Sequence, residues 1–185
     1  MIIAGIVGAE AAFWIVLGLA LVARYLLRRR RLSTILLLAL PVIDLALLTF
    51  VVADLARGAM PTPSHALAAS YLGFTVAFGH PLVSWADGVF AARFAGVPRP
   101  AKPAKGSAAY VRRLWVEWLR VVLAAAIAVG ILALLALGIR HETVPISIDQ
   151  AATNPLWAQM VTLGMVVAVW FFAGPAFARR TVGTG

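Results

Sequence analysis

Residues 119–139 read LRVVLAAAIAVGILALLALGI, and beyond Arg120 this stretch contains no charged side chain. A transmembrane helix needs about 20 predominantly apolar residues, with a range of about 17–25 when the helix is tilted. The stretch meets that requirement and is much longer than a buried strand. We therefore predict that it crosses a membrane as a helix.

The composition of the whole chain supports the same conclusion. Of its 185 residues, 63% are hydrophobic and 12% are charged, whereas a soluble domain averages about 45–50% apolar and about 25% charged residues. A chain of about 150 residues still exposes roughly a third of its unfolded surface after folding, so it cannot hide this much apolar surface from water. The composition excludes a soluble globular protein and a disordered one. The chain also has no cysteine, which excludes disulfides and thiolate metal sites.

Four further stretches have the same length and apolar character. The predicted spans cover about residues 2–27, 33–56, 64–85, 119–139 and 155–178. The predicted fold class is therefore all-α, a polytopic membrane helix bundle with five transmembrane helices in a single domain over residues 1–185. The main soluble segment is a basic loop at residues 88–113. Residues 141–154 form a loop on the opposite side, which could lie flat on the membrane.

The distribution of basic residues predicts the orientation of these spans. Fourteen of the sixteen basic residues fall in connections on one side of the membrane, whereas Arg57 and Arg140 fall on the other. Because Lys and Arg are retained in cytoplasmic loops, we expect the N-terminus outside and the C-terminus in the cytoplasm. The net charge of +9 then favours anionic lipid headgroups as partners rather than nucleic acid. The candidates for binding lipid or a partner on this side are Arg28, Arg29, Arg30, Arg31, Arg112, Arg113 and Arg120.

Three segments resemble known sequences. They are ARYLLRRRRLSTILLLALPVIDLALL at residues 23–48, SHALAASYLGFTVAFGHPLVSWAD at 64–87, and RFAGVPRP at 93–100 followed by RRLWVEWLR at 112–120. Through these segments the chain is similar to the YmcC-like family of small bacterial integral membrane proteins, least so after Ile139. The resemblance implies a multi-pass protein of the bacterial plasma (inner) membrane. The family has no assigned activity, so the resemblance supplies no catalytic residue.

Two acidic residues, Glu10 and Asp44, fall well inside predicted spans rather than at their ends. A charge at the centre of a span costs about 2.5–3.5 kcal/mol on the insertion scale. At about 1.5 Å per residue, the two acids lie at a similar depth on successive antiparallel helices, with Tyr71 and Thr75 near that level. Two carboxylates in a dry site would hold a proton or share a cation. Three interpretations are open: a site that handles protons or cations, protonated carboxyls that only bond neighbouring helices, and two groups that never meet.

A second polar cluster is expected at the outer edge of the membrane. Asp54 and Arg57 are three residues apart at the end of a span, and His65 follows just across the turn. A contact between Asp54 and His65 would form a pH-responsive lock, and the alternative is an interfacial salt bridge beside a solvated histidine. His141 follows the fourth span on the same side, and one haem between His65 and His141 is geometrically possible. We otherwise expect no cofactor and no metal.

Small residues recur at positions that favour close helix packing. Ala4, Gly8 and Ala12 follow one another at four-residue spacing on the first span, and Ala124 and Ala128 do so on the fourth. Small side chains let two helix backbones approach closely. The face on the first span could pack inside the bundle or against a second copy of the chain.

No stretch of the sequence carries a catalytic or nucleotide-binding motif of the common classes. His80, which Pro81 follows, is expected near a helix end. The leading prediction is a non-enzymatic accessory or assembly subunit, or a small homo-oligomer, with a membrane protein or a second copy as partner. One alternative is a small proton- or cation-linked transporter built on Glu10 and Asp44. Another is a haem-binding or lipid-modifying membrane enzyme.

Overall fold

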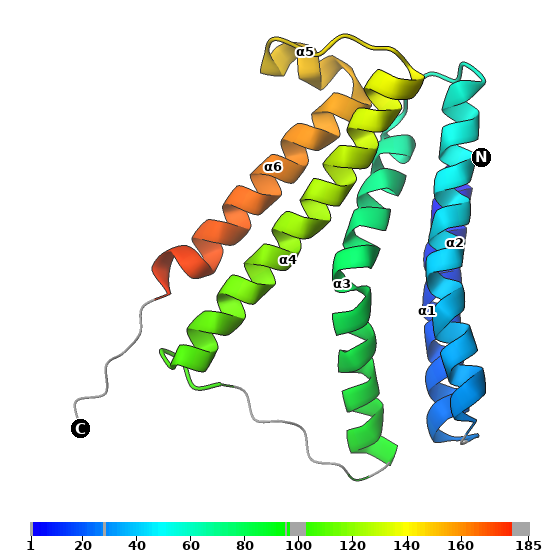
Figure 1. Cartoon of the computed structure of the whole chain (residues 1–185), viewed down its shortest axis with the longest axis vertical. Helices are drawn as coiled ribbons and strands as arrows, with labels where there is room; N and C mark the ends of the chain where they lie inside the picture. Colours follow the sequence, from blue (N-terminus) through cyan, green and yellow to red (C-terminus); the bar gives the residue numbers. More distant parts are fainter. Residues whose placement is uncertain (1, 28, 95, 97–102, 179–185) are drawn as a thin grey trace.

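The computed structural model describes residues 2–27, 29–94, 96 and 103–178, and the regular elements in this part of the chain are all helical (Figure 1). The side chains of some helical residues, among them Glu10, Arg30 and Asp44, lie outside the description, as does the whole of Arg28. The expectation of an all-helical protein is therefore confirmed over the described ranges.

Five long helices run in alternating directions along the molecule. They are α1 (Ile2–Tyr25), α2 (Arg30–Ala56), α3 (Pro63–Phe94), α4 (Ala108–Ala133) and α6 (Pro155–Ala173). The π-helical η1 (Leu134–Ile139) continues α4, the short α5 (Ile148–Thr153) precedes α6, and the 3-10 turn η2 (Pro175–Phe177) follows it. One end of the molecule holds the α2–α3 turn, η1 and α5, and we call it the α5 end (Figure 1). The opposite end, which holds the α1–α2 turn and the start of α4, is called the basic end.

Local signals in the sequence explain where several helices begin and end. The Ser107 hydroxyl accepts a hydrogen bond from the Tyr110 N–H at 3.1 Å and caps α4, while the Asn154 side chain accepts one from the Leu156 N–H at 2.9 Å and caps α6. Pro155 follows as the first residue of α6, where a missing N–H costs nothing. Gly58 adopts a φ of 90° just after α2, which few other residues tolerate.

Among the residues that the structure describes, three helices are long and apolar enough to cross a membrane: Pro63–Arg93, Ala108–Ile139 and Pro155–Phe177. The described parts of α1 and α2 contain the shorter apolar stretches Trp14–Tyr25 and Leu45–Ala56. The protein therefore combines an all-helical fold with several helices suited to a bilayer.

Two boundary predictions are wrong. The loop predicted at residues 88–113 is shorter, because α3 continues to Phe94 and α4 already begins at Ala108. The expectation that His80 ends a helix also fails, because Pro81 lies inside α3. Proline removes one intrahelical hydrogen bond and commonly kinks a helix, but α3 continues through Pro81 as far as Phe94.

The buried core is concentrated at the α5 end. Its fully buried members come from α2, α3, α4, η1 and α6, and include Val51, Leu55, Ala66, Ala69, Ala128, Leu132, Leu135 and Leu156. A smaller cluster of Leu17, Leu21 and Ala86 joins α1 to α3. Helix α3 is central, since it contacts α1, α2, α4 and α6. Towards the basic end, α3 and α4 diverge (Figure 1).

Gly73 allows the closest approach between α3 and α4. A Cβ atom added at Gly73 would lie 2.5 Å from the Ala124 carbonyl oxygen and 3.0 Å from the Ala128 Cβ. Ala124 and Ala128 are both fully buried, as small-residue packing on the fourth span predicts. On the first span, Gly8 is exposed with no atom within 4 Å of an added Cβ, so the described contacts do not place it inside the bundle. Packing of this face against a second copy stays a prediction.

Candidate functional site

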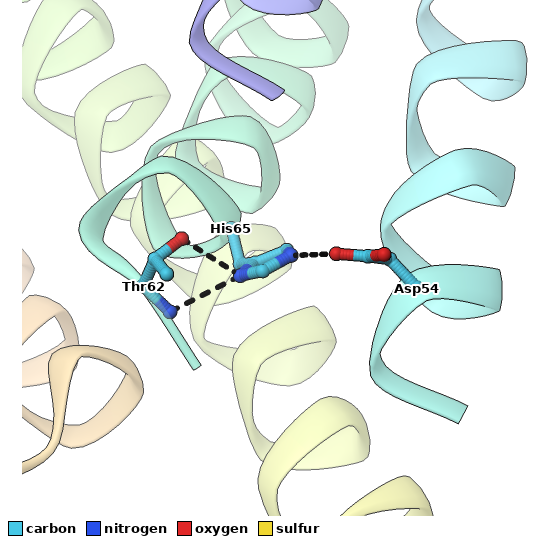
Figure 2. A network of polar contacts seen from close by, with 3 residues as sticks. All are labelled: Asp54, Thr62 and His65. Carbon is cyan, nitrogen blue, oxygen red and sulfur yellow. Dashed lines mark hydrogen bonds and ion pairs between the residues drawn. The ribbon is translucent and has the colours of Figure 1, made fainter. Parts of the chain in front are cut away.

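A network of polar contacts joins α2 to α3 at the α5 end (Figure 2). The His65 Nε2 lies 3.0 Å from the Asp54 Oδ2, and the His65 Nδ1 lies 3.1 Å from the Thr62 backbone nitrogen and 2.9 Å from its hydroxyl oxygen. His65 is 1% exposed, whereas the Asp54 side chain is 43% exposed. The predicted contact between Asp54 and His65 is therefore present, and its histidine is buried rather than solvated.

These contacts specify one tautomer of His65. A backbone N–H can only donate, so the Nδ1 must accept from Thr62 and the proton of a neutral ring resides on Nε2, where it is donated to Asp54. A second proton, on Nδ1, would face the Thr62 N–H and break that bond. A haem ligand at His65 would likewise have to displace Thr62 or Asp54, so this geometry does not fit haem ligation. The haem hypothesis stays a prediction for an absorption spectrum to test.

The other two members of the predicted outer cluster lie apart from this contact. Within the described part of the chain, the Asp54 carboxylate is paired with His65 and not with Arg57, which is exposed just after α2. His141 is exposed and adopts a φ of 52°. This left-handed residue ends η1, and the Glu142 N–H closes the turn on the Ala136 carbonyl at 2.9 Å. His141 therefore turns the chain out of η1 into the loop before α5.

The predicted carboxylate site lies partly outside the described residues. Glu10 lies on α1 and Asp44 on α2, two helices that pack against each other, but their side chains lie outside the described residues. Tyr71 and Thr75 line a small, mostly apolar hollow of about 180 Å³ together with Trp14 of α1. Ion handling by these residues stays a prediction.

A polar contact that the sequence did not predict joins α3 to α6. The Gln159 Nε2 donates to the Ser70 hydroxyl at 3.0 Å, and that hydroxyl donates to the Ala66 carbonyl at 3.0 Å. Ser70 therefore faces α6 rather than the hollow beside Tyr71. Hydrogen bonds between membrane helices contribute modestly, about 0.6 kcal/mol on average and up to about 1.7 kcal/mol.

Replacing Gln159 by leucine is expected to lower the free energy of unfolding by about 0.6–1.7 kcal/mol, because the Ser70 contact is lost while apolar volume is kept. The measurement is a titration with denaturing detergent followed by circular dichroism. Thr162→Val is the control, since the Thr162 hydroxyl is exposed and, within the described part of the chain, bonds the Ala158 carbonyl of its own helix and no other helix. Equal effects of the two substitutions would contradict a role for the Ser70–Gln159 bond.

At the basic end, Asp87 of α3 is held by α1. The Tyr25 hydroxyl donates to the Asp87 Oδ1 at 2.9 Å, and the Arg24 Nε lies 3.5 Å from the same oxygen. Arg113 pairs with Glu117 one turn along α4, at 2.7 Å. Arg113 and Glu117 lie on adjacent turns of one helix, and exposed pairs of this kind contribute at most about 1 kcal/mol.

Of the arginines predicted to bind lipid or a partner, Arg29 and Arg31 lie at the start of α2 and Arg112 and Arg113 near the start of α4, all at the basic end, whereas Arg120 lies midway along α4. Arg29, Arg31, Arg112 and Arg113 are exposed, and Arg120 is half-buried. Arg28 lies outside the described residues, as does the side chain of Arg30. The positions are those expected for contact with anionic headgroups, which stays a prediction.

An aromatic cluster joins α4 to α6 near the same end. The Trp118 Nε1 donates to the Val167 carbonyl at 3.2 Å. The Trp118 ring lies 5.4 Å from that of Phe171, and Trp115 packs edge-on against Trp118 at 5.7 Å. Tryptophan is enriched at the membrane interface because one ring edge is polar and the remainder apolar. The cluster therefore suits the headgroup level of a bilayer.

Helix α3 also presents polar and small residues on an uncovered face. His80, Ser84 and Gly88 are all exposed and follow one another at four-residue spacing, so they share one face of the helix. We call these three residues the α3 stripe. A Cβ added at Gly88 would have no neighbour within 4 Å. The stripe lies along the part of α3 from which α4 diverges (Figure 1).

The loop between η1 and α6 forms two adjoining hollows at the α5 end. The first is polar, has a volume of about 470 Å³ and includes Glu142 and Asn154 in its wall. The second is apolar, has a volume of about 350 Å³ and extends along Met160 and Val161 of α6. The sequence predicted a surface loop here, but it gave no sign of a hollow because the wall combines residues from distant parts of the loop. Within the described ranges, no group of three or more His, Asp or Glu side chains could hold a metal ion.

Comparisons with known proteins agree with a membrane protein. No family model and no solved structure matches the chain. The "Uncharacterized membrane protein YmcC" of Bacillus subtilis (strain 168) is 34% identical over 173 residues, which cover 92% of this chain and 90% of that protein. The resemblance that the three sequence segments suggest is thus confirmed over nearly the full length of both chains. The chain belongs to the YmcC family of membrane proteins.

Proposed function

We propose that this protein is a non-enzymatic assembly subunit of the bacterial plasma membrane that pairs with a second copy of itself through the α3 stripe. All five long helices span the bilayer in this proposal, with the α5 end outside and the basic end in the cytoplasm. The alternating directions of the helices and the concentration of arginine at one end support this orientation.

The exposed α3 stripe carries the proposal. His80 and Ser84 fall within the apolar helix Pro63–Arg93 and are exposed. Polar side chains in a span seldom face lipid, and they usually contact another helix. The adjacent Gly88 adds a position where a second backbone could approach closely.

A second copy is the partner that these residues favour. The stripe contains donor and acceptor groups, because an imidazole and a hydroxyl can each fill both roles. It can therefore pair with itself across a two-fold axis, which is the commonest symmetry of oligomers. Anionic lipid at the basic end would reduce the repulsion between the arginines of two copies.

Cysteine cross-linking tests this interface without interference, because the native chain has no cysteine. In membranes treated with a mild oxidant, Ser84→Cys is expected to give a disulfide-linked dimer. Thr162→Cys, at an exposed position of α6, is the control and should stay monomeric. Equal cross-linking at both positions, or none at Ser84→Cys, would contradict self-pairing through α3.

A further inference from the structure

The two hollows at the α5 end form one continuous surface with two chemical characters. Pro145 and Trp157 line both of them. On one side of this shared wall lie polar groups from the loop, and on the other side the apolar groove continues along α6 past Met160. Such a surface matches an amphiphile, with a polar head in the first hollow and an apolar tail in the second.

Glu142 sets the charge of the polar hollow. Among the residues that line it, Glu142 alone is charged, and the structure pairs it with no basic side chain in the described ranges. The Asn154 Nδ2 donates to the Glu142 Oε2 at 2.6 Å, while the Asn154 Oδ1 caps α6. Asn154 is thereby fixed at the helix start and holds the carboxylate in place, with the Oε1 available to a ligand. A positively charged donor is the complement of this arrangement.

The rim of the apolar groove places it at the level of the membrane interface. Val144, Ile146 and Ile148 line the groove and are strongly exposed, Ile146 at 91%. Apolar side chains of this kind on a surface loop insert into the boundary between headgroups and acyl chains. Trp157, which lines both hollows, has the mixed polar and apolar character that suits the same level. The polar hollow would then lie among the headgroups of one leaflet.

We infer that this surface binds one phospholipid that carries a primary ammonium headgroup, of the phosphatidylethanolamine class. The ammonium lies on the Glu142 carboxylate, where it donates to the Oε1, and one acyl chain lies in the groove beside Met160. An anionic headgroup without an amine is disfavoured, because the Glu142 carboxylate would repel it. This site is separate from the α3 stripe, so the two proposals can fail independently.

The test is lipid retention by the purified full chain, measured by native mass spectrometry after detergent exchange. The wild type is incubated with phosphatidylethanolamine or with phosphatidylglycerol of the same acyl chains. We expect one phosphatidylethanolamine per chain to be retained in preference to phosphatidylglycerol. Glu142→Gln is expected to weaken this retention at least about tenfold, since a charge-assisted hydrogen bond is lost. The matched control is Asp149→Asn, on α5 but outside both hollows, which should retain the lipid as the wild type does.

A second variant tests the groove separately from the carboxylate. Ile148→Ser changes an exposed residue of the groove wall, so the fold should be unaffected, and weaker retention of phosphatidylethanolamine is expected. Circular dichroism confirms that each variant is folded before its lipid content is compared. Equal retention by Glu142→Gln and wild type, or preference for phosphatidylglycerol, would overturn the inference. Equal loss in Asp149→Asn would also overturn it, because general loop charge would then explain the binding.

Discussion

Gly73→Val is expected to prevent stable packing of α3 on α4. A Cβ atom at this position would lie 2.5 Å from the Ala124 carbonyl oxygen and 3.0 Å from the Ala128 backbone nitrogen. Both obstacles belong to a helix backbone, so no rotamer change can relieve them, and the two helices must move apart. Overpacking in a well-packed core costs about 1–3 kcal/mol and occasionally more. A clash with a backbone belongs at the upper end of that range, and the added methyl groups of valine increase it.

The measurement is the free energy of unfolding in a detergent titration, with the yield of monodisperse protein as a second measure. Gly79→Ala is the matched control on the same helix, because its added Cβ would meet only the Thr75 Cγ2, at 3.9 Å. This control should be neutral or stabilising, since alanine favours a helix over glycine by about 1 kcal/mol. Wild-type stability of Gly73→Val would show that α3 and α4 do not pack as described.

The sequence of α3 contains a signal for this close approach. Ala69, Gly73 and Ala77 recur at four-residue spacing on α3, and all three are buried. The same spacing at Ala124 and Ala128 did predict a packed face. The pattern at Gly8 gave a prediction that the described contacts of one chain do not support. The spacing of small residues therefore indicates which face of a helix allows close packing. Which other helix packs against that face depends on the whole bundle.

Most of the architecture could be predicted, because lipid imposes a length and an apolar composition on each helix. The helix ends were less predictable where water replaces lipid as the surrounding solvent. Helix α3 continues to Phe94 and α4 begins at Ala108, although residues 88–113 are too polar to read as part of a span. Hydropathy reports the environment of a segment, and a helix can continue into polar residues after the apolar signal of a span has ended.

The polar sites were predictable only where the chain itself fixes their separation. Asp54 and His65 flank one short turn, so their contact could be expected, but the preference of Asp54 for His65 over Arg57 depends on how α3 packs. The bond between Ser70 and Gln159 joins residues far apart in the sequence. The hollow beside Glu142 directly follows His141, whose left-handed conformation no residue pattern predicted.

His65→Ala is expected to lower the free energy of unfolding by about 2–5 kcal/mol, the range for removing a large, fully buried side chain. His65 is 1% exposed and lies beside the core at the α5 end. Its loss leaves a cavity and also leaves the Thr62 N–H without its acceptor. Asp54→Ala should cost less, about 0.5–1.5 kcal/mol, because the Asp54 side chain is 43% exposed and water can replace part of the contact.

The variant Arg57→Ala distinguishes the Asp54–His65 contact from the Asp54–Arg57 salt bridge that the sequence suggests. If Asp54 is paired with His65, then Arg57 is an exposed residue without a part in the contact, and its replacement should change stability by less than about 0.5 kcal/mol. Unfolding titrations of the three variants should therefore rank His65→Ala as most damaging, Asp54→Ala as intermediate and Arg57→Ala as neutral. If Arg57→Ala instead matched Asp54→Ala while His65→Ala were neutral, the carboxylate would be paired within α2, and the link between α2 and α3 would rest on apolar packing alone.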